Sequence, residues 1–237
     1  MDPGGIVVLA AGVVGGIVAL AIAFSPKARL KRALARLPRL DVARVADGAM
    51  VKVLGQIGYQ GDPLVSPLSG RRCAYYEITV MERRSAGKQS HWVAIIKESD
   101  SRDFLLRDGT GKALVRIAGA AGARRVVLHQ DAHFSSGTFN DATPEIEAYL
   151  ARHAKSSTGL LFNKSLHYAE GILEEGETVV VAGQGRWEAD PDPDPGVAGA
   201  GYRDSPRRFV LTRGAQLELM VSDDPDVMGA PSGAGAA

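Results

Sequence analysis

The stretch PLVSPLSGRRCAYYEITV, residues 63–80, decides the fold because it joins a tight turn to a strand. Pro67 fixes its own φ and Gly70 permits a positive φ, and both properties are typical of turn residues. The apolar and aromatic residues that follow have the composition of a half-buried strand. The turn therefore delivers these side chains into a sheet: Cys73, Tyr75 and Ile78.

On both sides of this stretch, short runs of β-branched and apolar residues alternate with Gly, Pro, Asp and Ser, which predicts strands. One helix is expected at 144–153, where Thr143 can cap and Pro144 takes the first helical position. We therefore expect a mainly β (α+β) domain, a β-barrel-like or rolled sheet with one short helical insertion. The predicted strands are 50–57, 73–82, 91–97, 103–107, 113–117, 125–129, 165–173, 178–182, 208–212 and 216–221.

Two further turns and two polar segments complete the domain. The sequence DGTG at 108–111 predicts a tight turn, and Gly176 is expected at a hairpin tip before the strand at 178–182. The segment 189–201, ADPDPDPGVAGAG, lacks apolar periodicity and carries three prolines, so we expect a solvated loop. Its three aspartates could suggest calcium, but the alternating prolines hold the segment extended, which opposes the ring of oxygens that calcium needs. We expect no cofactor, and we expect disorder at 222–237.

Residues 5–24 read GIVVLAAGVVGGIVALAIAF, an uncharged run long enough to cross a hydrocarbon core. Bases follow this run instead of preceding it, which favours a retained single-pass anchor over a cleaved signal peptide. Because positive residues stay on the cytoplasmic side, we expect residues 1–4 outside and the domain at 41–221 in the cytoplasm. The Ala, Gly and Arg bias favours a bacterial plasma membrane.

Residues 25–40 are predicted to form a basic amphipathic helix beside the membrane, with Leu30, Leu34 and Leu37 on one face and Pro38 at its end. Such a helix can lie among headgroups and gain about 1 kcal/mol per base from anionic lipid. The alternative is a topology signal without lipid specificity. The bases expected to contact the membrane surface are Lys27, Arg29, Lys31, Arg32, Arg36 and Arg39.

Charge and small residues bear on the partners of the chain. Removing those six bases from the net charge of +1 leaves about −5, which argues against a nucleic-acid-binding domain. Gly12 and Gly16 have the spacing that lets two spans pack closely, so a homo-oligomer through this helix face is one hypothesis. The other explanation is that Gly and Ala are simply common in this chain.

The stretch at 63–80 also resembles the GIDE family, the beside-a-membrane (BAM) domain of mitochondrial membrane-anchored E3 ubiquitin ligases, which occurs in bacterial and plant membrane proteins too. Further similar segments are FLLRDGTG at 104–111 and LHYAEGILEEGETVVVAG at 166–183, and the resemblance spans roughly 47–221. The matching positions are Pro67, Leu68, Gly70, Cys73, Tyr75, Tyr76, Trp92, Asp108, Thr110, Gly111, Gly176 and Gly183.

The resemblance implies a membrane-proximal domain that recognises a substrate or binds another protein. The ligases carry a RING, whose zinc sites need about eight Cys and His ligands. Cys73 is the only cysteine here, so the sequence predicts an interaction module that is not itself a ubiquitin ligase. An accessory role in membrane-associated protein modification or quality control, with catalysis in another chain, is the second hypothesis.

A divergent metal-dependent enzyme is the third hypothesis. In LHQDAHF, residues His129, Asp131 and His133 would share one face of an extended strand, as in a two-His-one-carboxylate site. The simpler interpretation is a polar strand end. Cys73 is expected to be a small buried residue and not a nucleophile. Trp92, Phe104, Tyr75 and Tyr149 are expected in the core, although exposed aromatic residues would mark a binding face.

Overall fold

The computed structural model describes residues 25–87, 89–120, 124–129, 132–136, 142–158, 163–191 and 207–228. The predicted span at 5–24, with Gly12 and Gly16, and the last residues of the chain, 229–237, lie outside this part. None of the helices within the described ranges has both the length and the apolar composition needed to cross a bilayer.

The chain forms a mainly β fold built around a five-stranded mixed barrel. Strand β11 is long enough to pair with β12, with β1 and with β13, and its pairing with β1 closes the barrel. The pairing of β12 with β7 is parallel, and the other pairings in the ring are antiparallel. The ring consists of β1 (Met50–Tyr59), β6 (Phe104–Arg107), β7 (Lys112–Val115), β12 (Arg207–Thr212) and β11 (Thr178–Ala189).

Alternating side chains fill the barrel. Val51, Val53 and Ile57 of β1 point inward and are at most 3% exposed, in agreement with the period of two for a strand. Close packing also explains Gly183: a Cβ there would lie 2.5 Å from the carbonyl oxygen of Thr212. This glycine of the family-like motif therefore allows β11 to approach its neighbour.

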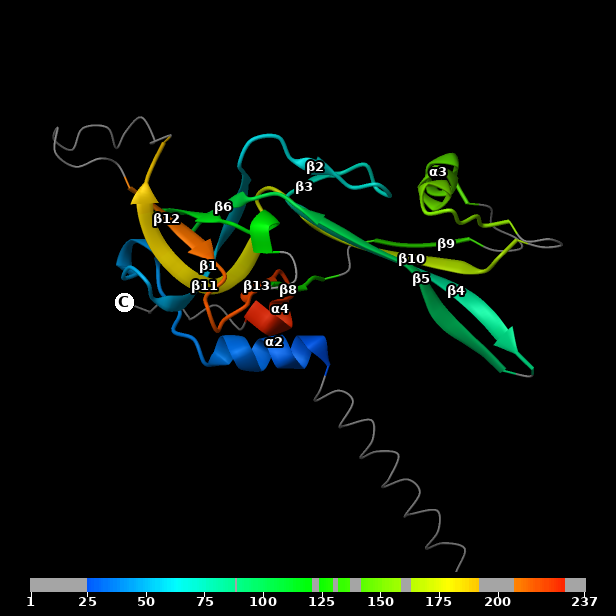
Figure 1. Ribbon diagram of the computed structural model, residues 1–237, viewed down its shortest axis with the longest axis horizontal. Coiled ribbons are helices and arrows are strands. Elements are labelled where there is room, and N and C mark those ends of the chain that lie inside the picture. The colour runs from blue at the N-terminus through cyan, green and yellow to red at the C-terminus, as the bar shows by residue number, and fades with distance from the viewer. Residues whose placement is uncertain are drawn as a thin grey trace, which may run out of the picture.

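Two short strands and several helical turns extend the barrel. Strand β13 (Leu219–Ser222) pairs with β11, and β8 (Arg124–Val127) adds to it in parallel. Helix α2 (Pro26–Ala35) and helix α4 (Pro225–Met228) lie against this side of the molecule (Figure 1). Short 3-10 turns occur at η1 (Val42–Arg44) and η2 (Ala118–Ala120).

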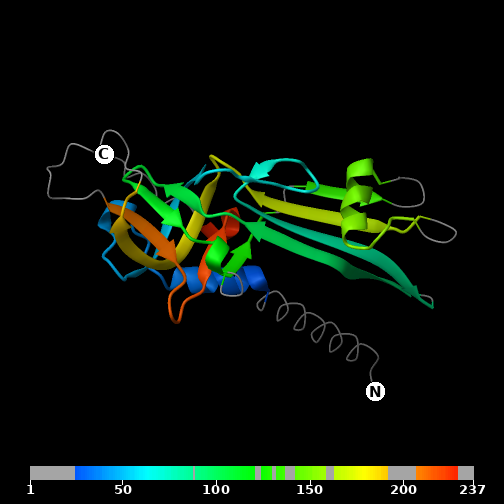
Figure 2. The same cartoon turned by 45° about the horizontal axis from the view of Figure 1, so that its top comes forward.

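A second, open sheet projects from the barrel, and we call this sheet together with its helix α3 the arm (Figure 1, Figure 2). Its four strands are antiparallel, and α3 covers one face through a cluster that includes Ile78, Leu150 and Tyr168. The arm consists of β5 (Gln89–Ser101), β4 (Tyr75–Ala86), β10 (Leu166–Leu173), β9 (Ala132–Ser136) and α3 (Pro144–Arg152). A small hairpin of β2 (Leu64–Val65) and β3 (Arg72–Cys73) lies where the arm meets the barrel.

Several predictions about local structure are confirmed. Helix α3 has Thr143 as its N-cap and Pro144 in its first turn, as its sequence predicted. The DGTG sequence turns β6 into the antiparallel β7, with Arg107 opposite Lys112. Most predicted strands are present within a few residues of their expected bounds.

Other expectations are corrected. Gly176 has the expected positive φ of 84°, but β10 and β11 do not pair, because β10 belongs to the arm and β11 to the barrel. The turn therefore links two sheets and is not a hairpin tip. The folded part also continues past Val221, since Val227 of α4 is only 5% exposed. Strands β2 and β9 and helix α4 were not predicted, whereas α2 and α3 lie where helices were expected, at 25–40 and 144–153.

Helix α2 differs most from its prediction. It ends at Ala35, so Arg39 lies beyond it and forms a β-bridge with Lys52. Its leucines do not point to a lipid layer: Leu30 and Leu34 pack against Val180, Ala182 and Met220. The apolar face of the helix is therefore used for docking on the barrel, and its basic face is exposed.

Candidate functional site

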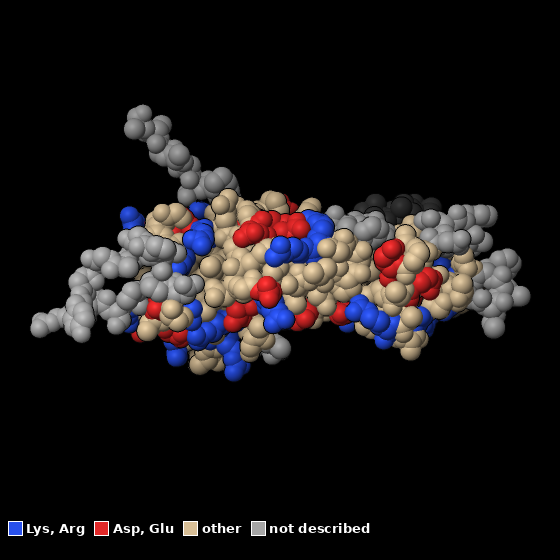
Figure 3. Space-filling model, turned by 90° about the horizontal axis from the view of Figure 1, so that it is seen from above, with Lys and Arg blue, Asp and Glu red and all other residues tan. Residues whose placement is uncertain are grey.

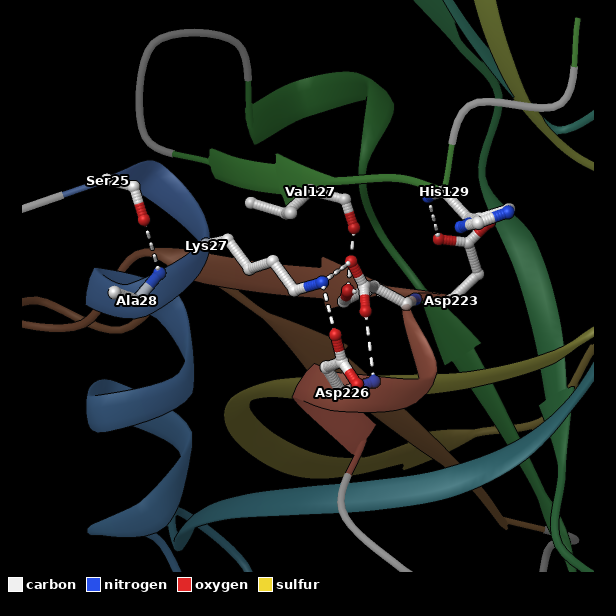
Figure 4. A network of polar contacts seen from close by, with 9 residues as sticks. Ser25, Lys27, Ala28, Val127, His129, Asp223 and Asp226 are labelled. Atoms are coloured by element: carbon white, nitrogen blue, oxygen red, sulfur yellow. Dashed lines mark hydrogen bonds and ion pairs between the residues drawn. The ribbon is translucent and has the colours of Figure 1, made fainter. Parts of the chain in front are cut away.

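The docked helix α2 is fixed at its N-terminal end by an ion-pair network, which we call the latch (Figure 4). The Ser25 hydroxyl accepts a hydrogen bond from the Ala28 N–H at 3.2 Å, which caps the helix. The Lys27 ammonium lies 2.8 Å from Asp224 Oδ2 and 2.7 Å from Asp226 Oδ2. The hydrogen bonds that Lys27 donates to Asp224 and Asp226 raise the pKa of Lys27 above its ordinary value, so this base is held charged.

The segment that carries the latch aspartates is itself anchored to β8. The Ser222 hydroxyl donates to the Val127 carbonyl at 2.6 Å, and Asp223 Oδ1 accepts the His129 N–H at 2.7 Å (Figure 4). The Asp224 side chain is only 8% exposed, and its ion pair with Lys27 supplies the opposite charge that a buried carboxylate needs. Residues that are far apart in the sequence thus meet at the start of α2.

A second set of contacts anchors the chain just after α2. Asp108 Oδ2 accepts the Val42 N–H at 2.6 Å, while Oδ1 accepts hydrogen bonds from Thr110 and from the Gly111 N–H. Burial raises the pKa of Asp108, but these hydrogen bonds outweigh it and lower the pKa below its ordinary value. The DGTG motif is therefore structural: it ties η1, and through it α2, to the barrel.

Helix α2 and the residues just after it carry the bases predicted to contact lipid. Among these bases, Lys27 is the exception, because it is partly buried in the latch. The apolar residues of the helix face the barrel, and the charged ends of the other bases reach solvent. The exposed bases are Arg29, Lys31, Arg32, Arg36 and Arg39.

The turn within residues 63–80 meets the segment 166–183, which also resembles the GIDE family, at the buried carboxylate of Glu170. Glu170 is fully buried, and its Oε1 accepts hydrogen bonds from the Ser66 hydroxyl and, at 3.4 Å, from the Ser69 N–H. Gly70 closes this turn with a φ of 69°, and Pro67 and the partly buried Leu68 lie within it. These residues fix the junction between arm and barrel.

Cys73 is fully buried beside this junction, and burial raises the pKa of its thiol to about 12. A thiol with such a pKa is neutral near pH 7 and is a poor nucleophile. This agrees with the prediction of a small buried residue. Tyr75 is also buried, and burial raises its pKa to about 12.

Helix α3 is held on the arm by a polar cluster around Glu98. The Tyr76 hydroxyl donates to Glu98 at 2.8 Å, and His153 Nε2 lies 2.8 Å from Glu98 Oε2. Burial raises the pKa of Glu98, but the hydrogen bonds from Tyr76 and His153 outweigh this and lower it below the usual 4.5. Tyr76 therefore positions α3, and we find it in a structural role.

Trp92 contradicts its expected place in the core. Phe104, Tyr75 and Tyr149 are buried as predicted, but Trp92 is 39% exposed. Its ring lies on His167 of β10, with ring centroids 4.1 Å apart. This pair lies on the side of the sheet opposite α3, and it could not be predicted because it depends on the register of the strands.

The structure describes only part of the proposed metal site and brings no two of its three side chains together within the described residues. His129 lies at the end of β8, and its backbone N–H bonds to Asp223. Asp131 lies outside the described residues, and only the backbone of His133, paired with Ala169, is described. Within the described part of the chain no group of three His, Cys, Asp or Glu side chains could hold a metal. The metal site stays a prediction.

The latch was missed because the tail was expected to be disordered. A signal was present, since Asp224 before Pro225 has the same cap-then-proline pattern as Thr143 before Pro144, from which α3 was predicted. Searches with this chain find no matching family model, no matching curated protein and no matching solved structure.

Proposed function

We propose that this protein is a single-pass membrane-anchored module that binds a protein partner, or recognises a substrate protein, at the cytoplasmic face of a bacterial plasma membrane. One observation carries the proposal: Leu30 and Leu34 of α2 are 0% and 2% exposed against the barrel. Only Ser25 separates α2 from the apolar run at 5–24. The barrel is therefore joined to the predicted span through a packed helix and not through a flexible linker.

The distribution of charge supports this orientation. Helix α2 and the residues just after it carry five exposed bases, whereas the opposite side of the molecule shows acidic and basic side chains side by side (Figure 3). Bases next to a span favour the cytoplasmic side and are attracted by anionic lipid. In this proposal the side with α2 faces the membrane, and the side with α3 faces the cytoplasm.

The resemblance to the GIDE family supports recognition as the role of the domain. The positions that carry the resemblance, among them Gly70, Asp108 and Gly183, make turns and close contacts in this fold. They carry no chemistry of ubiquitin transfer, and a single cysteine provides no RING. The proposal is therefore a binding module whose position is set by its anchor.

Topology reporters test the anchor and its direction. The full chain is fused after Ala237, so that the latch stays intact, either to a fluorescent protein or to alkaline phosphatase. We expect fluorescence, inactive phosphatase and resistance to carbonate extraction. Val14→Arg should release the protein from membranes, with Val14→Leu as the matched control, because a charge in a span is costly. Active phosphatase with a dark fluorescent fusion would contradict the orientation.

Site-specific crosslinking tests the binding role. A photoreactive residue at Ala148, which is exposed on α3, should yield one discrete crosslinked protein in intact cells. The same residue at Arg36 of the opposite side should yield lipid adducts or none. Absence of a discrete product from Ala148 and from other exposed positions of α3 would contradict a protein-binding role for this side.

A further inference from the structure

The sheet of the arm has one face covered by α3. The other face meets β8 and the residues after it near the barrel, and the described residues leave its outer half open. In β4, Ile78 and Val80 point to α3, whereas Thr79, Met81 and Arg83 alternate to the other face. The paired residues set the same sides on the neighbouring strands, with Lys97 opposite Thr79, Trp92 opposite Arg83 and His167 opposite Met81. We call this second side the open face.

The outer half of the open face combines an aromatic pair with a base. Trp92 is 39% exposed and lies on the ring of His167. Beside it, the exposed Arg83 donates two hydrogen bonds to the Ser90 hydroxyl, at 3.0 and 2.9 Å. Lys97 is exposed further along the same face. Tryptophan next to arginine is the combination found where proteins meet the membrane–water interface.

The open face and the start of α2 lie on one side of the molecule. Pro26, the first residue of α2, lines a shallow hollow together with Glu77, Thr79 and Gly171 of the open face. Figure 1 shows α2 and the tip of the β4–β5 hairpin at the lower side, and α3 at the upper side. The start of α2, which directly follows the predicted span, therefore lies on the side of the molecule to which the open face with Trp92 is turned.

We propose that the open face is a second contact with the anionic membrane surface, made by Trp92 and His167 with Arg83 and Lys97. The inference rests on the proposed membrane anchor. It assigns anionic lipid as the partner of the open face, which the anchor itself does not contact. Because the apolar run ends at Phe24, a bilayer would begin next to Pro26 and extend under the open face. The bases of this face and those of α2 have the sign that anionic headgroups attract.

Two separate contacts would have a mechanical consequence. One docked helix fixes the barrel beside the membrane but leaves rotation about the span free. A second contact at the β4–β5 hairpin removes this rotation, since the two contacts lie at different ends of the molecule (Figure 1). The side with α3 would then always face the cytoplasm, which favours capture of a partner by reducing the orientational freedom lost on binding.

Tryptophan quenching in vesicles tests the contact. The full chain is reconstituted in phosphatidylcholine vesicles with and without phosphatidylglycerol, using lipids that carry a quencher near the headgroup. Trp92→Phe should lose most of the quenching seen for the wild type. Trp187→Phe should keep it, because Trp187 packs on Phe209 of the barrel and its indole N–H bonds to the Val45 carbonyl. Arg83→Glu should reduce quenching in the anionic vesicles.

Each outcome is informative. If Trp187→Phe does not fold, the difference between the wild type and Trp92→Phe still measures the contribution of Trp92. Equal quenching of these two proteins, in samples that still float with the vesicles, would overturn the open-face contact and leave the anchor standing. Failure to float would contradict the anchor itself. Loss of Trp92 exposure only at high protein density would indicate a second copy on this face and would also overturn the lipid contact.

Discussion

The barrel and the arm bury their apolar sheet faces in different ways. The barrel closes through the pairing of β1 with β11, so its side chains pack on one another, and α2 and α4 cover one outer side. The arm is an open sheet: α3 covers one of its faces, and within the described residues the outer half of the other face is uncovered. The barrel therefore supplies stability, whereas the arm supplies exposed surface.

Removal of a large core side chain from the barrel should have the strongest effect on stability. Phe209 is fully buried within the ring, so Phe209→Ala should lower the free energy of unfolding by about 3 to 5 kcal/mol. Denaturant titration of the full chain in detergent measures this change. A loss near that of an exposed substitution such as Thr178→Ala would contradict the central role of the barrel.

The same kind of change in the arm should act locally. Leu150 of α3 is fully buried against the sheet, and Leu150→Ala should cost about 2 to 5 kcal/mol of local stability. Because Cys73 belongs to the same cluster, its alkylation rate should rise while amide protection of β11 is retained. Ala151→Ser on the exposed side of α3 is the control. Simultaneous loss of protection in β11 would mean that arm and barrel unfold as one unit.

The cap of α2 should contribute less than either core. Ser25→Ala removes the acceptor for the Ala28 N–H and should destabilise the helix by about 1 kcal/mol. Ser25→Asp keeps an acceptor and should restore the wild-type value. Hydrogen exchange of the α2 amides provides the measurement, and equal exchange of both variants and the wild type would argue against the cap.

The smallest expected effect is a loss of amide protection in α3 at low pH. The pKa of Glu98 is lower in the folded protein than its usual 4.5, so its contribution is present above that value and is lost as pH falls through the folded pKa. Amide protection in α3 should therefore decline below about pH 4.5 before that of the barrel. Glu98→Gln should remove this separate step. An unchanged acid profile in that variant would exclude Glu98 as its source.

Local patterns predicted much of the fold, and contacts between distant residues explain what they missed. Thr143 and Pro144 identified α3, and DGTG identified the β6–β7 turn, because each depends on neighbours in the sequence. Whether the turn at Gly176 forms a hairpin depends on which sheet the next strand joins, and no local sequence pattern contains that information. The helical spacing correctly predicted that Leu30 and Leu34 lie on a different face of α2 from its bases. The same spacing is expected whether that apolar face packs on lipid or on a barrel.

The candidate surfaces were predicted less well than the fold. The bases of α2 were evident from their clustering, whereas the exposure of Trp92 follows from the β4–β5 register and from the position of α3. The latch joins Lys27 to Asp224 and Asp226, which lie about two hundred residues further along the chain. The sequence Asp224–Pro225 could have indicated the short helix α4, but its pairing with Lys27 leaves no signature in a single sequence.

Hydrogen exchange of α2 in lipid vesicles tests the central claim, that this helix docks on the barrel and fixes the domain to its anchor. In samples that float with the vesicles, the amides of Leu30 and Leu34 should exchange as slowly as those of β11, with and without anionic lipid. Rapid exchange that slows only when anionic lipid is added would show a helix held by headgroups and would contradict the account.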